Sequence, residues 1–265
     1  MQTNLPLGSI LQFDEFETYE GRRNTRPVSV PILIERKSRF VIWAESASIR
    51  PHGRMSRQRL RAIQQEEERT GPRRNNSARG VVRTLKRATA LLPEDAVVCL
   101  ETDQKPTYPI HARIVFAGRK LIHSRTNSEL ARLTWNPLFP INHTEAMLRD
   151  LLGRTRRQSW LASKRRRYLD LGLQMWIAYR NLVRRRFNFD DSTPAQLVGA
   201  LDRRLRLGEL VSWRQDWGRK SIHPLSRRGS SIRDWAARRT SSSPADHTEP
   251  SQFLQKPGTK SATTA

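Results

Sequence analysis

Short apolar runs rich in β-branched residues most strongly limit the folds open to this chain. Pro27 to Ile34 (PVSVPILI) and Arg39 to Ser46 (RFVIWAES) are two such runs, and the charged turn Glu35-Arg36-Lys37-Ser38 separates them. Two β-rich runs joined by a short polar turn are typical of a hairpin. Ser9 to Glu17 (SILQFDEFE) precedes them and has the imperfect alternation of a partly buried strand. The chain is therefore predicted to open with three adjacent strands.

Helical and strand patterns alternate after the hairpin. A basic, Gln-rich insertion at about 50–80 is predicted to hold a short helix over 56–69, followed by a loop. A second helix over 78–92 leads into Ala96 to Leu100 (AVVCL), a continuous apolar run typical of a buried central strand. A helix followed by a buried strand indicates a parallel crossover. A turn or short helix and then a fifth strand over Ala112 to Ile122 complete the predicted sheet.

The second half of the chain is predicted to be helical. Leu133 to Pro140 contains two prolines and cannot be regular helix, whereas a helical period begins at Ile141. A longer helix carries an apolar stripe at Leu169, Leu173, Trp176, Ile177 and Leu182. Thr193-Pro194 combines an N-cap residue with proline at the first helical position and so predicts a further helix start.

These patterns predict an α/β fold with a mixed five-stranded sheet flanked by helices. We expect an N-terminal arm over 1–8 and a core over 9–158 that contains the basic insertion. A basic helical extension over 159–223 and a disordered tail over 224–265 follow, because the tail is rich in Ser, Thr and Arg and lacks an apolar period.

Charge narrows the function. Lys and Arg number 49 against 25 Asp and Glu, so the net charge is 49 − 25 = +24. Positive charge of this size favours a polyanion, and nucleic acid is the commonest in a cell, with an anionic membrane surface or a protein as the other partners. No apolar stretch approaches the roughly 20 residues that span a bilayer, and no signal peptide pattern is present. We therefore expect a cytoplasmic, nucleoid-associated protein with no membrane partner.

Several classes of site lack their sequence patterns. The single cysteine, Cys99, leaves neither an intrachain disulfide nor a thiolate cluster for zinc. The phosphate-binding glycine motifs of ATP and dinucleotide sites and the Gly-x-Ser-x-Gly motif of serine hydrolases are also missing. We expect no nucleotide cofactor.

Isolated acids within this basic chain are the candidate catalytic groups. Asp14 lies inside the first predicted strand, Asp103 just past the end of the AVVCL strand, and Glu145 near the start of a basic helix. Carboxylates gathered from such positions could hold two Mg²⁺ or Mn²⁺ ions about 3.5 to 4 Å apart. The residues alone equally allow Asp14 and Glu15 to be a solvated strand edge and Asp103 a turn former.

Three segments carry a resemblance to a known family. They are QFDEFETYEGRR, ETDQKPTYPIHARI and INHTEAMLRDLLGRTRRQSWLASKRRRYLDL, set in an order of strands and helices that has acids in the first and fourth strands. Together they resemble the ribonuclease H-like catalytic core of DDE-type transposases from small bacterial insertion sequences, over roughly residues 9–185. The third segment is the most specific. The resemblance implies DNA transposition and recombination: magnesium-dependent cleavage of a DNA strand and transfer of its end to target DNA.

The same resemblance assigns the site residues. Asp14 and Asp103 would be the first two catalytic acids and metal ligands. The family's usual glutamate falls at Asn142, so Glu145, one helical turn later, is the leading third ligand. Asp150 is an alternative, as is a site with no third carboxylate. Members usually carry an upstream DNA-binding module, and we expect this chain to lack it because fewer than ten residues precede the first predicted strand.

The basic helices are the predicted contacts to DNA. Phosphate contacts are expected from Arg149, Arg154, Arg156, Arg157, Lys164, Arg165, Arg166 and Arg167. The partners would be the DNA ends of the mobile element and its target, bound by a homo-oligomer that brings the ends together. The alternative is a basic nucleic-acid-binding protein, transposase-derived or not, without catalytic activity.

Overall fold

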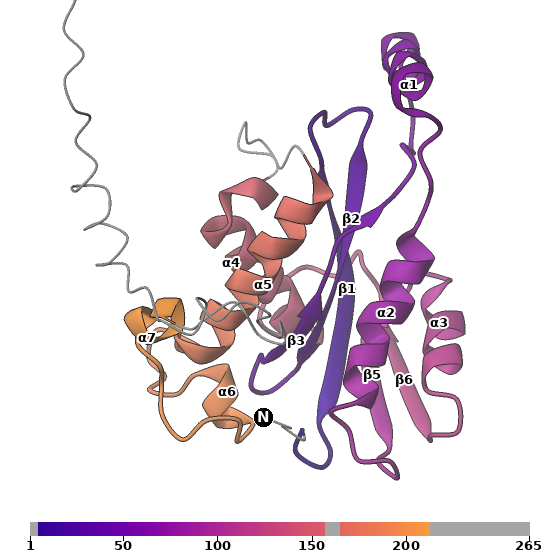
Figure 1. The fold of residues 1–265 in the computed structure, drawn as a ribbon. Coiled ribbons are helices and arrows are strands. Elements are labelled where there is room, and N and C mark those ends of the chain that lie inside the picture. Colours follow the sequence, from indigo (N-terminus) through magenta and orange to yellow (C-terminus); the bar gives the residue numbers. More distant parts are fainter. Residues whose placement is uncertain (1–4, 157–164, 213–265) are drawn as a thin grey trace, which may run out of the picture. The chain divides into compact units, whose positions relative to one another are not determined.

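A computed structural model describes residues 5–156 and 165–212. They form an α/β structure in which a mixed, open, six-stranded sheet is flanked by helices (Figure 1). The strands are β1 (Ile10–Tyr19), β2 (Pro27–Glu35), β3 (Val41–Ala44), β4 (Ala47–Ser48), β5 (Val98–Asp103) and β6 (Leu121–Thr126). The helices are α1 (Arg57–Thr70), α2 (Ser77–Thr89), α3 (Tyr108–Val115), α4 (Phe139–Leu151), α5 (Arg166–Leu182), α6 (Pro194–Leu197) and α7 (Leu207–Ser212), with a 3₁₀ turn η1 at Gly153–Thr155.

The sheet has the order β3-β2-β1-β5-β6, and β4 pairs with β2 beside β3. β1, β2 and β3 are antiparallel neighbours, as the predicted hairpin requires. β5 is parallel to β1, and β6 is parallel to β5, which confirms the predicted crossover. The predicted sheet had five strands, and the two-residue β4 is the additional one.

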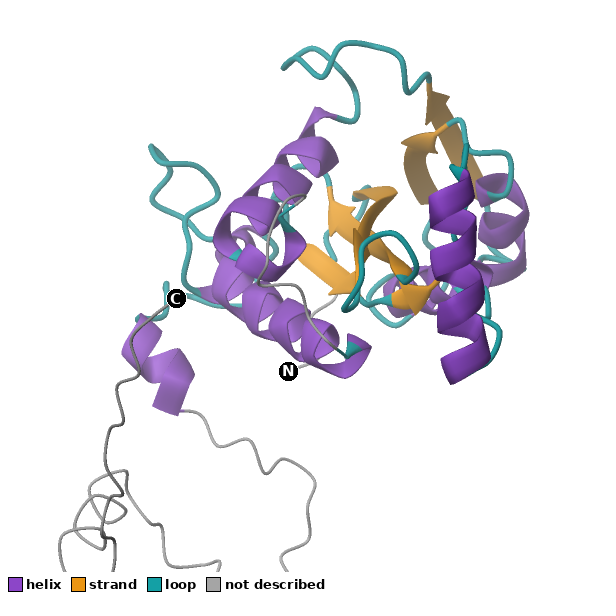
Figure 2. Cartoon of the chain, turned by 90° about the horizontal axis from the view of Figure 1, so that it is seen from above, coloured by secondary structure: helices purple, strands orange, loops and turns teal. Residues whose placement is uncertain are grey.

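Each face of the sheet has its own apolar core, because successive side chains of β1 point to opposite faces. Phe13 packs with residues of α2 and α3 in one cluster. Phe16 packs with residues of α4 and α5 in the other, including Leu169 and Leu173. Figure 2 shows the strands lying between these two helical layers. The apolar stripe predicted for the long helix is therefore confirmed as core.

The predicted fifth strand over Ala112 to Ile122 is wrong. The first part of that range belongs to α3, and the strand begins only at Leu121. Tyr108, Ala112 and Phe116 are buried at a spacing of four residues, whereas Ile114 is 60% exposed. An apolar run as short as Ile-Val-Phe suits a helix or a strand equally well, and here the spacing of four and Pro109 in the first turn select the helix.

The described helix boundaries agree with the remaining helical predictions. α1, α2 and α5 lie close to their predicted ranges, and α4 begins near Ile141. Thr193 caps α6 through a capping box with Gln196. The predicted tail over 224–265 lies outside the described residues. No helix in the described ranges has the length and apolar character needed to cross a membrane.

Candidate active site

The parallel pairing of β1 and β5 brings the first two predicted acids together. Gln12 lies opposite Glu101 in this register. The paired residues end there, and Asp14 and Asp103 lie two residues further along β1 and β5, with Asp103 as the last residue of β5. Both aspartates line one hollow of about 630 Å³, which we call the acidic cleft. Strand pairing thus converts a separation of 89 residues in sequence into adjacency.

Asp14 is held in an environment that opposes its ionised form. Burial raises the pKa of Asp14 to about 7, and the negative charge of Asp103 adds to this effect. A hydrogen bond of 2.7 Å from the Glu15 amide to Asp14 Oδ1 and the positive charge of Arg132 act in the opposite direction. Asp14 therefore exchanges its proton near neutral pH, and a cation bound beside it would favour the carboxylate.

Glu15, the next residue, has the opposite character. Its carboxylate forms an ion pair with Lys105 and accepts hydrogen bonds from Ser29 (2.7 Å), Ser77 (2.8 Å) and Tyr108 (3.0 Å). Burial raises the pKa of Glu15, but the Lys105 ammonium and the two serine hydroxyls lower it further, so the net shift is downward. Glu15 thus ties together β1, β2, α2 and the start of α3 as a fully partnered carboxylate.

The side-chain amide of Gln12 fixes the start of α4 against β1. Its nitrogen donates to Glu101 Oε2 at 2.6 Å and to the Pro137 carbonyl at 2.7 Å. Its oxygen accepts a hydrogen bond of 3.1 Å from the Ile141 backbone amide. Gln12 is fully buried, so these contacts replace all of its interactions with water. No sequence signal marks this role, because Gln12 is an ordinary polar residue in an alternating strand.

A second contact shows that α4 runs alongside β1. The guanidinium carbon of Arg149 lies 5.0 Å from the Phe16 ring. Arg149 lies eight residues after Ile141 on α4, a rise of about 12 Å along the helix. Phe16 lies four residues after Gln12 on β1, a rise of about 13 Å along the strand. Helix and strand therefore stay side by side between the two contacts. Glu145 is midway on the helix and Asp14 midway on the strand, so they lie at the same level.

Asp150, the alternative candidate for the third acid, is far more exposed than Glu145. Glu145 is 4% exposed, on the side of α4 that carries the core residues Ile141 and Leu148. The Asp150 side chain is 81% exposed and lies 3.8 Å from the guanidinium of Arg156. α4 thus directs Glu145 inward and Asp150 to solvent.

The carboxylate oxygens of the acidic cleft are the kind of ligand that a hard divalent cation prefers, although they do not by themselves complete a coordination shell. Among residues 5–156 and 165–212, no three acid, histidine or cysteine side chains approach closely enough to form a metal site as they stand. Asp14 and Asp103 nevertheless both supply carboxylate oxygens to the cleft, and the charge of Asp103 disfavours the ionised form of Asp14. A cation between them would relieve that repulsion.

A second hollow adjoins the acidic cleft and is basic. Its lining includes Arg23, Arg59 and Arg149, and we call it the basic cleft. Both clefts are lined by Glu17 and His52, whose side chains are 3.1 Å apart. The arginines of the basic cleft therefore lie next to the carboxylates of the acidic cleft. Sequence reasoning found Arg149 but missed Arg23 and Arg59, which belong to a polar turn and an insertion helix.

The predicted DNA-binding residues do not continue as one helical stripe, because α4 ends at Leu151. The side chain of Arg154 donates to the Tyr168 carbonyl at 3.3 Å, and that of Arg156 to the Asp150 carbonyl at 3.1 Å. Arg165 and Arg167 are exposed, and Arg166 is partly buried. Arg157 and Lys164 lie outside the described residues.

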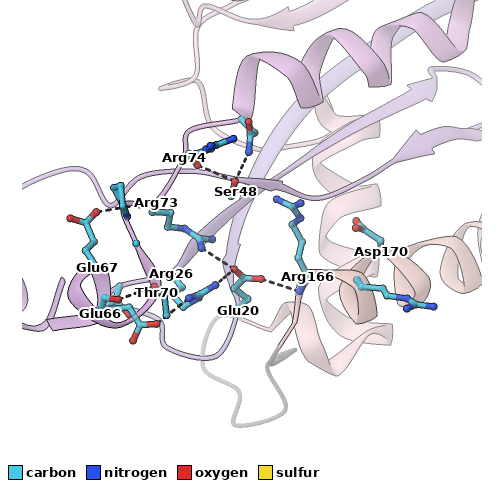
Figure 3. Close-up of a pocket in the computed structure, with 15 residues that line it drawn as sticks. Glu20, Arg26, Ser48, Glu66, Glu67, Thr70, Arg73, Arg74, Arg166 and Asp170 are labelled. Atoms are coloured by element: carbon cyan, nitrogen blue, oxygen red, sulfur yellow. Dashed lines mark hydrogen bonds and ion pairs between the residues drawn. The ribbon is translucent and has the colours of Figure 1, made fainter. Parts of the chain in front are cut away.

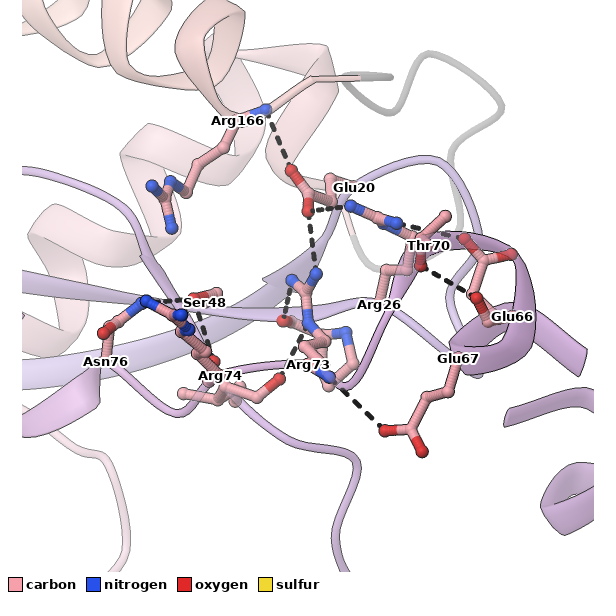
Figure 4. Close-up of polar contacts among 12 residues, drawn as sticks. Glu20, Arg26, Ser48, Glu66, Glu67, Thr70, Arg73, Arg74, Asn76 and Arg166 are labelled. Atoms are coloured by element: carbon pink, nitrogen blue, oxygen red, sulfur yellow. Dashed lines mark hydrogen bonds and ion pairs between the residues drawn. The ribbon is translucent and has the colours of Figure 1, made fainter. Parts of the chain in front are cut away.

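The hollow shown in Figure 3 has a structural role, because Glu20, Arg26, Glu66 and Arg73 in its lining are paired with one another. Glu20 accepts hydrogen bonds from Arg26 (2.9 Å), Arg73 (2.8 Å) and the Arg166 backbone amide (2.9 Å) (Figure 4). Arg26 also bonds to Glu66 of α1 at 3.0 Å. These five residues, the Glu20 clasp, join the end of β1 to α1, to the segment before α2 and to the start of α5.

Comparisons of the chain with protein-family models, with curated proteins and with solved structures find no match.

Proposed function

We propose that this protein is a DDE-type transposase with a ribonuclease H-like core, which cleaves DNA and transfers the freed end in a reaction that depends on Mg²⁺ or Mn²⁺. The observation that carries the proposal is the placement of three acids from distant parts of the chain. Asp14 and Asp103 come from the neighbouring strands β1 and β5 and line one cleft, and Glu145 lies at the level of Asp14 on α4. A sheet of order β3-β2-β1-β5-β6 with helices on both faces supports it, because it has the element order of the family resemblance.

Each acid has a distinct part in this proposal. Asp14 and Asp103 would hold the metal ions, with Glu145 as the third ligand. The metals would supply activation of the attacking oxygen and neutralisation of charge on the leaving one. Because Asp14 is largely buried, bulk water would screen the charges at this site less. Asp14 must lose its proton before its carboxylate can bind a metal ion. Gln12 positions α4, and hence Glu145, by binding the Ile141 amide.

The experiment that tests the function is a DNA cleavage assay. The DNA would carry the sequences that flank the coding region, and the products would be followed with Mg²⁺ or Mn²⁺. Asp14→Asn and Asp103→Asn are each expected to lower the cleavage rate by about 10³-fold or more, because metal binding contributes several kcal/mol to the transition state. DNA binding should persist in both variants.

Two further variants test the third ligand. Glu145→Gln should lose activity, whereas the matched change Asp150→Asn, on the exposed side of the same helix, should keep it. The reverse pattern would move the third ligand to Asp150. Metal-independent binding with no cleavage by the unaltered protein would favour the non-enzymatic alternative.

The basic cleft is the proposed path of the DNA strand that reaches the acids. Its cations adjoin the carboxylates through Glu17 and His52, so a phosphate backbone could follow one continuous surface. We propose that a homo-oligomer presents two such surfaces when it holds both ends of the element.

Salt dependence distinguishes this path from general attraction to a basic protein. The double variant Arg23→Gln/Arg59→Gln is expected to reduce the slope of log K against log salt by about 2, since each phosphate contact contributes about 0.9. Arg113→Gln/Arg125→Gln removes the same charge from exposed positions on α3 and β6 and should change the slope by much less. Equal changes in slope from the two double variants would show that the DNA does not pass along the basic cleft. Binding isotherms across a salt series give the slopes.

A further inference from the structure

A second group of charged residues lies away from both clefts, where the turn between β2 and β3 meets α4 and the end of α5. Arg39 comes from the turn, His143 from α4 and Arg180 from α5. Arg39 is 5% exposed and Arg180 is fully buried. Buried guanidinium groups ordinarily pair with carboxylates. Within the described ranges, neither arginine forms an ion pair.

Each of the three side chains has a buried nitrogen with no hydrogen-bond partner. These atoms are Nη1 of Arg39, Nε of Arg180 and Nδ1 of His143. The other nitrogens of Arg180 are satisfied, because Nη1 and Nη2 donate to the carbonyls of Arg185 and Arg186, both at 3.1 Å. The guanidinium of Arg180 is thus held in place with one nitrogen, Nε, left without a partner.

Two aromatic rings lie against both Arg39 and His143. Arg180 lies close enough to both that, in addition to burial, its charge lowers the pKa of His143 and the charge of Arg39 lowers the pKa of Arg180. The guanidinium carbon of Arg39 lies 4.5 Å from the Phe187 ring and 5.3 Å from the Phe139 ring. The imidazole of His143 lies 6.0 Å and 5.8 Å from the same two rings. Phe187 is itself 37% exposed, so one of the two rings is partly open to solvent.

The positive charges in this group oppose one another. Burial and the nearby charge of Arg186 lower the pKa of Arg39 to about 10, and burial and the charge of Arg39 do the same for Arg180. Both remain cations at neutral pH. The two acids of the loop after α5, Asp190 and Asp191, are paired with Arg186 and Arg185. Arg39 also adopts a left-handed backbone, with φ of 58°, which a non-glycine residue rarely does without compensation.

We propose that Arg39, His143 and Arg180 form a binding site for one small oxyanion of the phosphate or sulfate class. Such an anion would accept hydrogen bonds from the three unpartnered nitrogens and neutralise the two buried cations. Guanidinium groups suit oxyanions because their donors match the spacing of the oxygens. The bound anion would join the β2–β3 turn, α4 and α5. The burial of both arginines favours a free ion over a phosphate within a DNA duplex.

The test is thermal unfolding at constant ionic strength, with inorganic phosphate replacing chloride. Bound phosphate should raise the midpoint of the unaltered protein in a saturable way, by about 5 to 10 °C when its concentration is about 100 times its dissociation constant. Phosphate also stabilises proteins generally by exclusion from their surfaces, so variants are needed. Arg39→Asn should abolish the saturable shift, and asparagine suits the left-handed backbone. Arg87→Asn removes an exposed arginine that stacks on Trp43 and should keep the shift.

Equal phosphate shifts in the unaltered protein and in Arg39→Asn would overturn the proposal. If Arg39→Asn does not fold, calorimetric titration of the unaltered protein with phosphate decides: one site per chain, displaced by sulfate but not by chloride, supports the proposal, and no saturable binding overturns it. A duplex without terminal phosphates serves as the competitor. Displacement of phosphate by this duplex would assign the site to the DNA backbone and overturn the free-ion occupant.

Discussion

Asp14→Asn is expected to make the protein more stable at pH 8 by about 2 to 4 kcal/mol. In the unfolded chain this carboxyl ionises near its ordinary pKa of 3.8, whereas in the folded protein its pKa is about 7. The full shift of 7 − 3.8 = 3.2 corresponds to about 4 kcal/mol, and residual contact with solvent reduces it. Because the folded-state pKa is raised, the unaltered protein loses this stability as pH rises from about 4 to 7. Asparagine avoids the loss.

Urea unfolding at pH 4.5 and pH 8 measures this effect. The gain from Asp14→Asn should be full at pH 8 and fall to about a quarter of that, about 1 kcal/mol before the reduction for solvent contact, at pH 4.5, where the folded protein carries a protonated Asp14 while the unfolded chain is already largely ionised at this residue. Glu15→Gln is the matched control on the neighbouring residue. Glu15→Gln should destabilise the folded protein by about 1 to 2 kcal/mol, because it removes a carboxylate that pairs with Lys105 and accepts hydrogen bonds from three hydroxyls. A loss of stability of equal size at both pH values in Asp14→Asn would contradict the proposed burial of its charge.

Divalent metal should reverse the order of stability at pH 8. Mg²⁺ binding to the folded protein would raise the unfolding midpoint of the unaltered chain and leave Asp14→Asn unchanged. Below pH 7 the proton on Asp14 competes with the metal, so the increase should diminish. The stability cost of an ionised Asp14 would then be the counterpart of its capacity to bind metal, since burial and the charge of Asp103 both disfavour the carboxylate and a bound cation would offset both.

The neighbours Asp14 and Glu15 show where prediction from sequence reaches its limit. Both are acids within one strand, and nothing local distinguishes a raised pKa from a lowered one. The difference arises mainly from Lys105, 90 positions away in sequence, and from the hydroxyls of Ser29 and Ser77, all of which contact the Glu15 carboxylate. Sequence identified Asp14 and Asp103 as candidates because acids within or at the ends of apolar strands are unusual. Their adjacency required the register of β1 and β5.

The same limit explains which elements were predicted. The opening strands and α5 have strong periods and long apolar runs, so local pattern sufficed. α3 did not, because its apolar centre is three residues long and only burial of Tyr108 and Phe116 reveals its period. The basic cleft was missed for a related reason: Arg23 and Arg59 lie in a turn and an insertion, and only folding brings them beside Arg149.

Glu20→Gln is expected to destabilise the protein by about 3 to 5 kcal/mol, which is the largest loss we predict. The side chains of Glu20 and Arg73 are 9% and 10% exposed. Removing the charge of Glu20 leaves the buried guanidinium of Arg73 without the carboxylate that it pairs with. Arg73 is held in place by its bonds to the carbonyls of Ile49 and Pro27, so it cannot turn to solvent without breaking them. Breaking a buried pair costs more than the pair contributes to folding, because the remaining charge stays desolvated.

The pH dependence of the Glu20 clasp has the opposite sign to that of Asp14. Burial raises the pKa of Glu20, but hydrogen bonds from Arg73 and Arg26 lower it further, so the net shift is downward. Its contribution is therefore present at neutral pH and lost as pH falls through its lowered pKa. Chemical denaturation of Glu20→Gln at pH 7, against the exposed α1 control Glu68→Gln, measures the loss. A change no larger than that of Glu68→Gln would show that the clasp does not stabilise the fold. Cleavage of α1 by added protease should accelerate in Glu20→Gln alone, because the clasp joins this helix to the end of β1.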